Sequence, residues 1–141
     1  MRLWASYIAQ ARRPAPSDGR DGRSLSYQIT REQQYLDEAR RIARSAEARF
    51  VNEDGVITGP GKLGVKLIEA FLTLSETDGD AHWRHVVRRC LSTLHRHRNE
   101  AGWYPQNWEA EPPPAERPVR LIDQAAPARA YWVAAEHGRT G

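Results

Sequence analysis

The sequence has little cysteine, little lysine and no long apolar run. A single cysteine, Cys90, excludes an intramolecular disulfide framework and a cysteine-based zinc site. No apolar stretch approaches the roughly 20 residues that a helix needs to span a bilayer, which excludes a helical membrane protein. Only two of the 21 basic residues are lysine, and arginine is spread among 18 acidic residues, so a net charge of +3 does not indicate a nucleic-acid partner. The remaining composition, 40% hydrophobic and 28% charged over 141 residues, predicts one globular domain.

The N-terminal segment is predicted as a short helix over residues 1–13 and a flexible loop over residues 14–26. The loop contains prolines and two Asp-Gly turns. An export signal ending at Ala9-Gln10-Ala11 is the alternative, but the apolar stretch of about seven residues is shorter than such signals. The cytoplasm is therefore favoured over export. The apolar face of the helix consists of Leu3, Trp4, Tyr7, Ile8 and Ala11.

Residues 27–141 are predicted as a helical-hairpin domain. Apolar residues recur at helical period over 30–50, 63–76, 80–98 and 121–137, and no segment alternates as a strand does. Thr30 with Gln33 has the pattern of a capping box and predicts the start of the first of these helices. Gly138 predicts the stop of the last helix, and Pro127 predicts either a kink within it or the start of its second segment.

The predicted helices form an internal repeat of about 47 residues. A shift of 47 aligns residues 27–56 with residues 74–103 and gives seven identities in thirty positions. The unit, a helix, a long loop, a helix and a short turn, is typical of hairpins stacked in a solenoid or a closed toroid. The sequence thus predicts an all-α fold of stacked antiparallel helical hairpins. Its long loops, over 52–61 and 99–119, should share one rim, opposite the short turn at 77–80.

The longer loop concentrates aromatic, amide and carboxylate side chains. Aromatic faces pack on the C–H faces of sugar rings, while amides and carboxylates bond sugar hydroxyls, so an oligo- or polysaccharide is the expected partner. Alternatively, the aromatic rings pin the loop to the helix ends. The candidate substrate-binding residues are Trp103, Tyr104, Gln106, Asn107, Trp108 and Glu109.

Other reactive residue types form no recognised site. Only His82 and His85 have the spacing of two ligands on one helix face, and no partner carboxylate completes a set, so neither a metal nor a cofactor is predicted. The carboxylates of the rim have no spacing that requires glycoside hydrolysis. Cys90 falls within an apolar stripe and is predicted as a small core residue.

Two short segments carry a resemblance to a known family. They are Tyr27-Gln28-Ile29-Thr30 and Gln34-Tyr35-Leu36-Asp37-Glu38-Ala39, and residues 52–55 and 64–80 continue the pattern. This succession resembles the step between consecutive helices in the six-hairpin (α/α) toroid glycosidases, most of all the family 76 glycoside hydrolases (α-1,6-mannanase-like). The resemblance implies a glycoside hydrolase-like protein that corresponds to the C-terminal part of a toroid.

The catalytic aspartates of that family form an Asp-Asp pair, which this chain lacks. Its adjacent acidic residues are Asp37-Glu38 and Glu53-Asp54. No catalytic residue is therefore assigned, and enzymatic activity stays open. Because an open hairpin array exposes apolar helix faces, we expect association with a second copy or with a complementing toroid domain. The alternative function is a non-catalytic helical-repeat interaction module, in which the aromatic loop anchors a protein.

Overall fold

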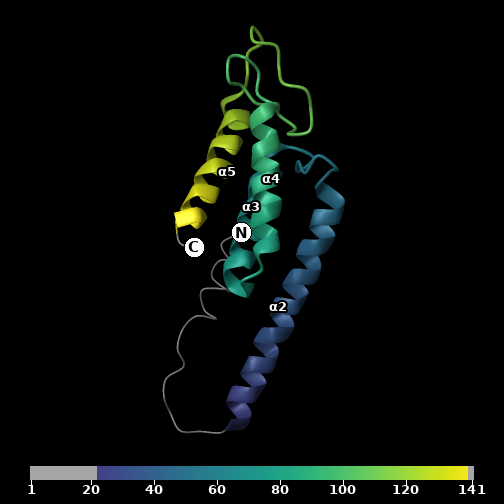
Figure 1. Cartoon of the computed structure of the whole chain (residues 1–141), viewed down its shortest axis with the longest axis vertical. Coiled ribbons are helices and arrows are strands. Elements are labelled where there is room, and N and C mark those ends of the chain that lie inside the picture. Colours follow the sequence, from purple (N-terminus) through teal and green to yellow (C-terminus); the bar gives the residue numbers. More distant parts are fainter. Residues whose placement is uncertain (1–21, 140–141) are drawn as a thin grey trace. The chain divides into compact units, whose positions relative to one another are not determined.

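The computed structural model describes residues 22–139, and their side chains from Ile29 onward. This part contains four helices: α2 (Gly22–Phe50), α3 (Gly61–Asp78), α4 (Ala81–Arg96) and α5 (Leu121–Arg139) (Figure 1). It contains no strand, only isolated bridges in the loops. The all-α fold is confirmed. The helix predicted over 1–13 and the loop predicted over 14–21 lie outside the described residues.

Helix α2 begins at Gly22 and not at Thr30, so the loop predicted over residues 22–26 is wrong. Residues 23–29 contain neither glycine nor proline, and nothing in their backbone chemistry stops a helix from propagating through them. The side chain of Gln33 donates to Asp37 at 3.0 Å, one turn further along the helix. The chain divides into two units, Met1–Ala39 and Arg40–Gly141, and α2 crosses their boundary.

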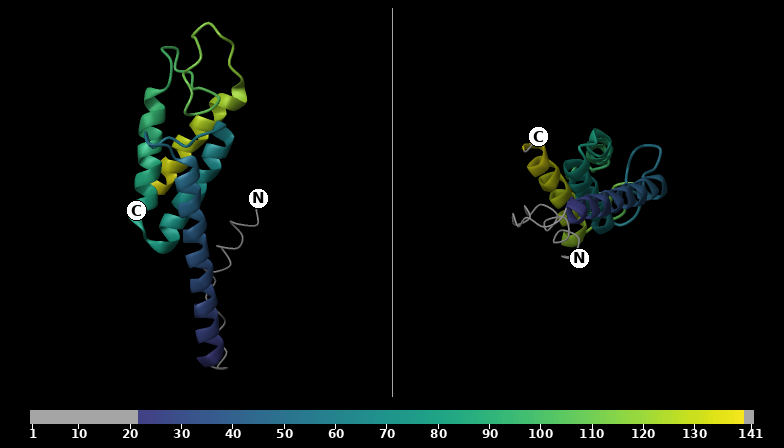
Figure 2. Two further views of the ribbon diagram at one scale, coloured as in Figure 1. Left: turned by 90° about the vertical axis from the view of Figure 1, so that its right-hand side faces the viewer. Right: turned by 90° about the horizontal axis from the view of Figure 1, so that it is seen from below.

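The core of the second unit lies among α3, α4 and α5. Helix α3 packs against both α4 and α5, whereas α4 and α5 contact each other less (Figures 1 and 2). Phe71 of α3 stacks on Trp83 of α4 with 5.3 Å between ring centroids. Burying each large apolar side chain contributes roughly 1.5–3 kcal/mol to stability, so this cluster holds the three helices together. Its other fully buried members include Ile57, Ile68, Cys90 and Leu94.

The short turn between α3 and α4 is fixed by two consecutive residues. Gly79 takes the left-handed conformation (φ 74°) and donates its N–H to the Ser75 carbonyl at 2.9 Å, which ends α3. The Asp80 carboxylate accepts from the His82 N–H at 2.9 Å and so caps α4. The turn predicted at 77–80 is therefore confirmed, and it leaves the long loops at the other end of these helices (Figure 1).

Helix α5 continues through Pro127 and past Gly138. The prediction that Gly138 ends the helix is wrong. Glycine stops a helix by taking a positive φ, and Gly138 is not among the glycines that do so. Pro127 is buried and removes only one donor from the helix. Among the described residues, no helix is both long and apolar enough to cross a membrane.

Candidate binding site on the loop rim

The loops over 51–60 and 97–120 meet in one rim, as the repeat predicts. The Gly61 N–H donates to the Gln106 carbonyl at 3.0 Å, and the Trp108 N–H donates to the Gly59 carbonyl at 3.3 Å. The Gly59 N–H donates in turn to Oε2 of Glu109 at 2.8 Å. These bonds join the end of the first loop to the middle of the second, where the latter arches between α4 and α5 (Figure 2).

Each loop opens with the same asparagine turn. The Asn52 N–H donates to the Val56 carbonyl at 3.0 Å, and Oδ1 of Asn52 accepts from the Val56 N–H at 2.9 Å. Asn99 makes the same two bonds with Trp103, at 3.0 and 2.9 Å. The sequence identity between these two segments therefore reflects an identical local backbone structure.

Trp108 is fully buried over two glycines of α3. A Cβ on Gly64 would lie 2.5 Å from Cζ3 of the indole, and a Cβ on Gly61 would lie 2.5 Å from its Nε1, so only glycine leaves room for the ring. The Trp108 carbonyl lies 3.1 Å from Nδ1 of His97. Trp108 therefore pins the loop to a helix end, which was the alternative to sugar binding. The prediction that Trp108 contacts a sugar is wrong, because its ring has no exposed surface.

Tyr104 is also part of the packing. Its N–H donates to Oε1 of Gln124 at 2.9 Å, and Nε2 of Gln124 donates back to its carbonyl at 2.9 Å, which ties the loop to α5. Its ring lies 6.2 Å from that of Tyr131, whose hydroxyl donates to the Leu91 carbonyl at 2.9 Å. Burial, with a further contribution from the Tyr104 hydrogen bond, raises the pKa of Tyr131 well above the ordinary value for tyrosine.

Four of the six predicted site residues stay at the surface: Trp103, Gln106, Asn107 and Glu109. The indole of Trp103 is 39% exposed. Gln106 and Asn107 contact the other loop through their backbones and leave their side chains exposed. Glu109 uses one carboxylate oxygen to hold Gly59. The structure therefore offers a ligand one aromatic ring, two amides and a carboxylate.

A hollow of about 700 Å³ lies beside the turn that carries Trp103. The sequence pattern did not predict this hollow. The signal was present in the repeat, since Asn99 and Glu100 are among the identities and both line the hollow. The lining residues are His95, Arg96, Arg98, Asn99, Glu100, Ala101 and Gly102.

The other residue types that could carry chemistry, histidine and cysteine, are engaged in contacts that stabilise the fold. His82, one of the two histidines at metal-ligand spacing, lies 2.8 Å from a carboxylate oxygen of Glu47. Cys90 is fully buried, as predicted, and burial raises the pKa of its thiol to about 11, partly offset by a hydrogen bond with the backbone of Ile57. Within residues 22–139, no three His, Cys, Asp or Glu side chains group in a way that could hold a metal.

A search of solved structures finds a GH76 α-mannanase from Bacteroides thetaiotaomicron, with a TM-score of 0.60 and 22% sequence identity over 82% of this chain. The fold is that of part of an (α/α) toroid. The resemblance to family 76 glycoside hydrolases is thereby confirmed at the level of the fold. This chain spans 33% of the α-mannanase chain, so the similarity concerns about one third of that toroid. The sequence matches no protein-family model and no curated protein.

Proposed function

We propose that this chain binds an oligosaccharide or polysaccharide on the rim formed by residues 51–60 and 97–120, as part of a glycoside hydrolase-like toroid. The fold shared with a GH76 α-mannanase supports this proposal and makes mannose-based glycans the first ligands to test. The exposed amides and the carboxylate of the rim supply the hydrogen bonds that sugar hydroxyls require.

The observation that carries the proposal is the exposure of Trp103. In the first loop the equivalent position is Val56, which is fully buried. The turn around it has the same hydrogen bonds in both loops, so the same turn forms with a small buried side chain at this position. Trp103 instead places a large ring at the surface, where its apolar face costs free energy unless a ligand covers it.

The proposed role is binding, and no catalytic residue is assigned. The Asp-Asp pair of the family is missing, and of the acidic pairs present, Glu53-Asp54 holds α4 through its backbone. The Glu53 carbonyl accepts from Arg89, and the Asp54 carbonyl accepts from Thr93. We propose that a complementing toroid domain or a second copy supplies further helices, and that any acid pair for hydrolysis comes with them.

One further observation bears both on the proposal and on the alternative, a non-catalytic interaction module. Helix α5 exposes three large apolar side chains: Leu121 (84%), Ile122 (61%) and Trp132 (56%). Exposed apolar residues gathered on one element are typical of a protein contact. Leu121 and Trp132 lie on one side of α5, and this side also suits a further toroid helix, so the exposure supports both candidates. The sugar experiment separates them.

The test is calorimetric titration of the full chain with linear α-1,6-linked manno-oligosaccharides. We expect saturable binding that Trp103→Ala weakens by about 1–2 kcal/mol, or roughly 5- to 30-fold, because the stacked ring is lost. The matched control is Trp132→Ala, which removes another exposed indole away from the rim and leaves the affinity unchanged. If manno-, gluco- and xylo-oligosaccharides all give no heat, the carbohydrate proposal fails and the interaction module takes its place.

A further inference from the structure

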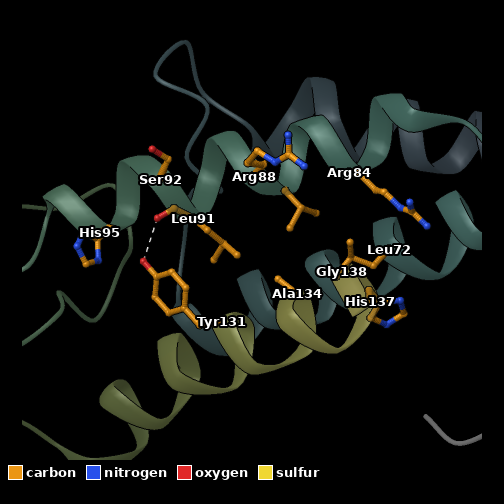
Figure 3. Close-up of a pocket in the computed structure, with 11 residues that line it drawn as sticks. Leu72, Arg84, Arg88, Leu91, Ser92, His95, Tyr131, Ala134, His137 and Gly138 are labelled. Carbon is orange, nitrogen blue, oxygen red and sulfur yellow. Dashed lines mark hydrogen bonds between the residues drawn. The ribbon is translucent and has the colours of Figure 1, made fainter. Parts of the chain in front are cut away.

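A second cavity, of about 360 Å³, runs as a groove between α4 and α5 (Figure 3). Its floor is apolar and comes from three helices: Leu72 from α3, Val87 and Leu91 from α4, and Ala134 from α5. The hydroxyl of Tyr131 is already committed to the Leu91 carbonyl, as the dashed line in Figure 3 shows. The groove thus presents an apolar floor that lacks a partner among the described residues.

The two flanks of α4 differ in what covers them. On one flank, His82 meets the Glu47 carboxylate at 2.8 Å, and Thr93 donates to the Asp54 carbonyl at 3.2 Å. The part of α2 that belongs to the second unit, and the loop after it, therefore occupy that side. At 3.6 residues per turn, the groove residues of α4 fall on the opposite side of the helix. The residues that lie most directly on that side are Arg84, Arg88, Leu91 and His95, and α4 also contributes Val87 and Ser92 to the groove.

The groove carries two unpaired cations. Neither Arg84 nor Arg88 has a hydrogen-bond or ion-pair partner among the residues that the structure describes. The Nε of Arg84 is also buried without an acceptor, and a buried charged donor is costly to leave unsatisfied. His137 lies at the end of the groove toward which Arg84 extends (Figure 3). Its Nδ1 is 2.6 Å from the Glu76 carboxylate. The Glu76 carboxylate therefore contacts His137, and both guanidinium groups can pair with a carboxylate of a molecule bound in the groove.

We propose that this groove receives an acidic amphipathic helix of a complementing domain, with two carboxylates one turn apart. Four of the groove residues of α4, Arg84, Arg88, Leu91 and His95, are spaced i, i+4, i+7 and i+11, which is the stripe that one face of a helix presents to a neighbour, and they span about 16 Å. Arg84 and Arg88 are one turn apart, so carboxylates at i and i+4 of the occupant can each meet a guanidinium. The inference rests on the proposal that further helices complete the toroid, and it adds the charge of the helix that docks here.

The test uses two synthetic helical peptides and the full ¹⁵N-labelled chain. Both peptides carry the same leucine and alanine stripe, and beside it one has glutamate and the other glutamine at two positions one turn apart. We expect the glutamate peptide to shift the amide signals of Leu72, Val87, Leu91 and Ala134 saturably, and the glutamine peptide to bind at least tenfold more weakly. Added salt should narrow that difference, because it screens the ion pairs.

Variants locate the charge effect. Arg84→Gln with Arg88→Gln should weaken the glutamate peptide at least tenfold, while Arg117→Gln, an exposed loop arginine, leaves it unchanged. Equal affinity of the two peptides, the absence of saturable shifts, or shifts confined to Leu121 and Trp132 would overturn the proposal. So would decanoate giving the same groove shifts and displacing the peptide, since the occupant would then be a small amphiphile. The sugar proposal is tested separately, by oligosaccharide titration of the unmodified chain and of Trp103→Ala, so the two proposals can fail independently.

Discussion

Asn52 and Asn99, 47 residues apart, make the same three turn hydrogen bonds. Each pairs through its N–H and its Oδ1 with the residue four positions later, and its carbonyl accepts from a glycine N–H at 2.9 Å. Those glycines, Gly55 and Gly102, take φ values of 85° and 84°. Such left-handed values favour glycine, which explains why the Asn-Glu-x-Gly pattern occurs at the start of both loops. Among the differences between the turns, Nδ2 of Asn99 also donates to the Pro113 carbonyl at 2.7 Å.

This difference predicts unequal effects of one substitution at the two sites. Asn99→Asp keeps the Oδ1 acceptor but sets a carboxylate oxygen against the Pro113 carbonyl, and we expect it to lower the free energy of unfolding by about 1–3 kcal/mol. Asn52→Asp, the matched control, retains its acceptor and should change stability by less than about 0.5 kcal/mol. Urea denaturation of both variants measures this, and equal losses at the two sites would contradict it.

Replacing Trp108 should destabilise the fold much more than replacing Trp103. Trp108→Ala removes a fully buried ring and leaves a cavity, so we expect a loss of about 3–5 kcal/mol in the free energy of unfolding. Trp103→Ala truncates a partly exposed ring and should cost much less. Thermal unfolding followed by circular dichroism compares the two. A Trp103→Ala variant as unstable as Trp108→Ala would mean that Trp103 is a packing residue too.

Two helical glycines allow a matched test of the close packing between Trp108 and α3. Gly64→Ala would place a methyl group 2.5 Å from the indole, and overpacking of this kind costs about 1–3 kcal/mol. Gly138→Ala meets nothing within 4 Å and exchanges a poor helix former for a good one, so it should be neutral or stabilising by up to about 1 kcal/mol. The denaturant midpoint of Gly64→Ala should fall, while that of Gly138→Ala should stay the same or rise. A Gly64→Ala variant as stable as the unmodified chain would contradict the close packing of Trp108 on α3.

Cys90 should make stability depend on pH in the alkaline range. Burial raises the pKa of its thiol from 9.0 to about 11, so between these values the unfolded chain loses the proton while the folded chain keeps it. The contribution of this group is therefore fully present below pH 9 and is lost as the pH rises toward 11. The control is Cys90→Ala, which introduces the residue found at the equivalent position 43. Unfolding at pH 8 and pH 10.5 should show a larger drop for the unmodified chain than for the variant.

Much of the fold could be predicted from the sequence because it depends on local pattern. Helical periodicity located all four described helices, and the Gly79-Asp80 turn has a purely local cause in backbone conformation and capping. Boundaries were less predictable. Thr30 has the residue type of a cap but lies inside α2, and Gly138 has the residue type of a stop but keeps helical geometry. Both residues permit a helix end without requiring one.

The candidate site could be predicted only in part, because it depends on distant contacts. The sequence indicated an aromatic loop, but the choice between Trp103 and Trp108 as the buried ring depends on Gly61 and Gly64, which lie in α3 and far from the loop in sequence. The groove of Arg84 and Arg88 was missed for the same reason. Its walls come from separate helices, and it exists only once α4 and α5 pack on α3.

The carbohydrate proposal is tested most directly by the indole N–H signals of the full ¹⁵N-labelled chain during titration with an α-1,6-linked manno-oligosaccharide. At about 10 mM ligand, even a Kd near 1 mM would nearly saturate the site. We predict that the Trp103 signal shifts saturably, while the signals of buried Trp83 and Trp108 and of exposed Trp132 stay in place. A Trp103 signal that does not move, or a shift confined to Trp132, would contradict a sugar site on the rim.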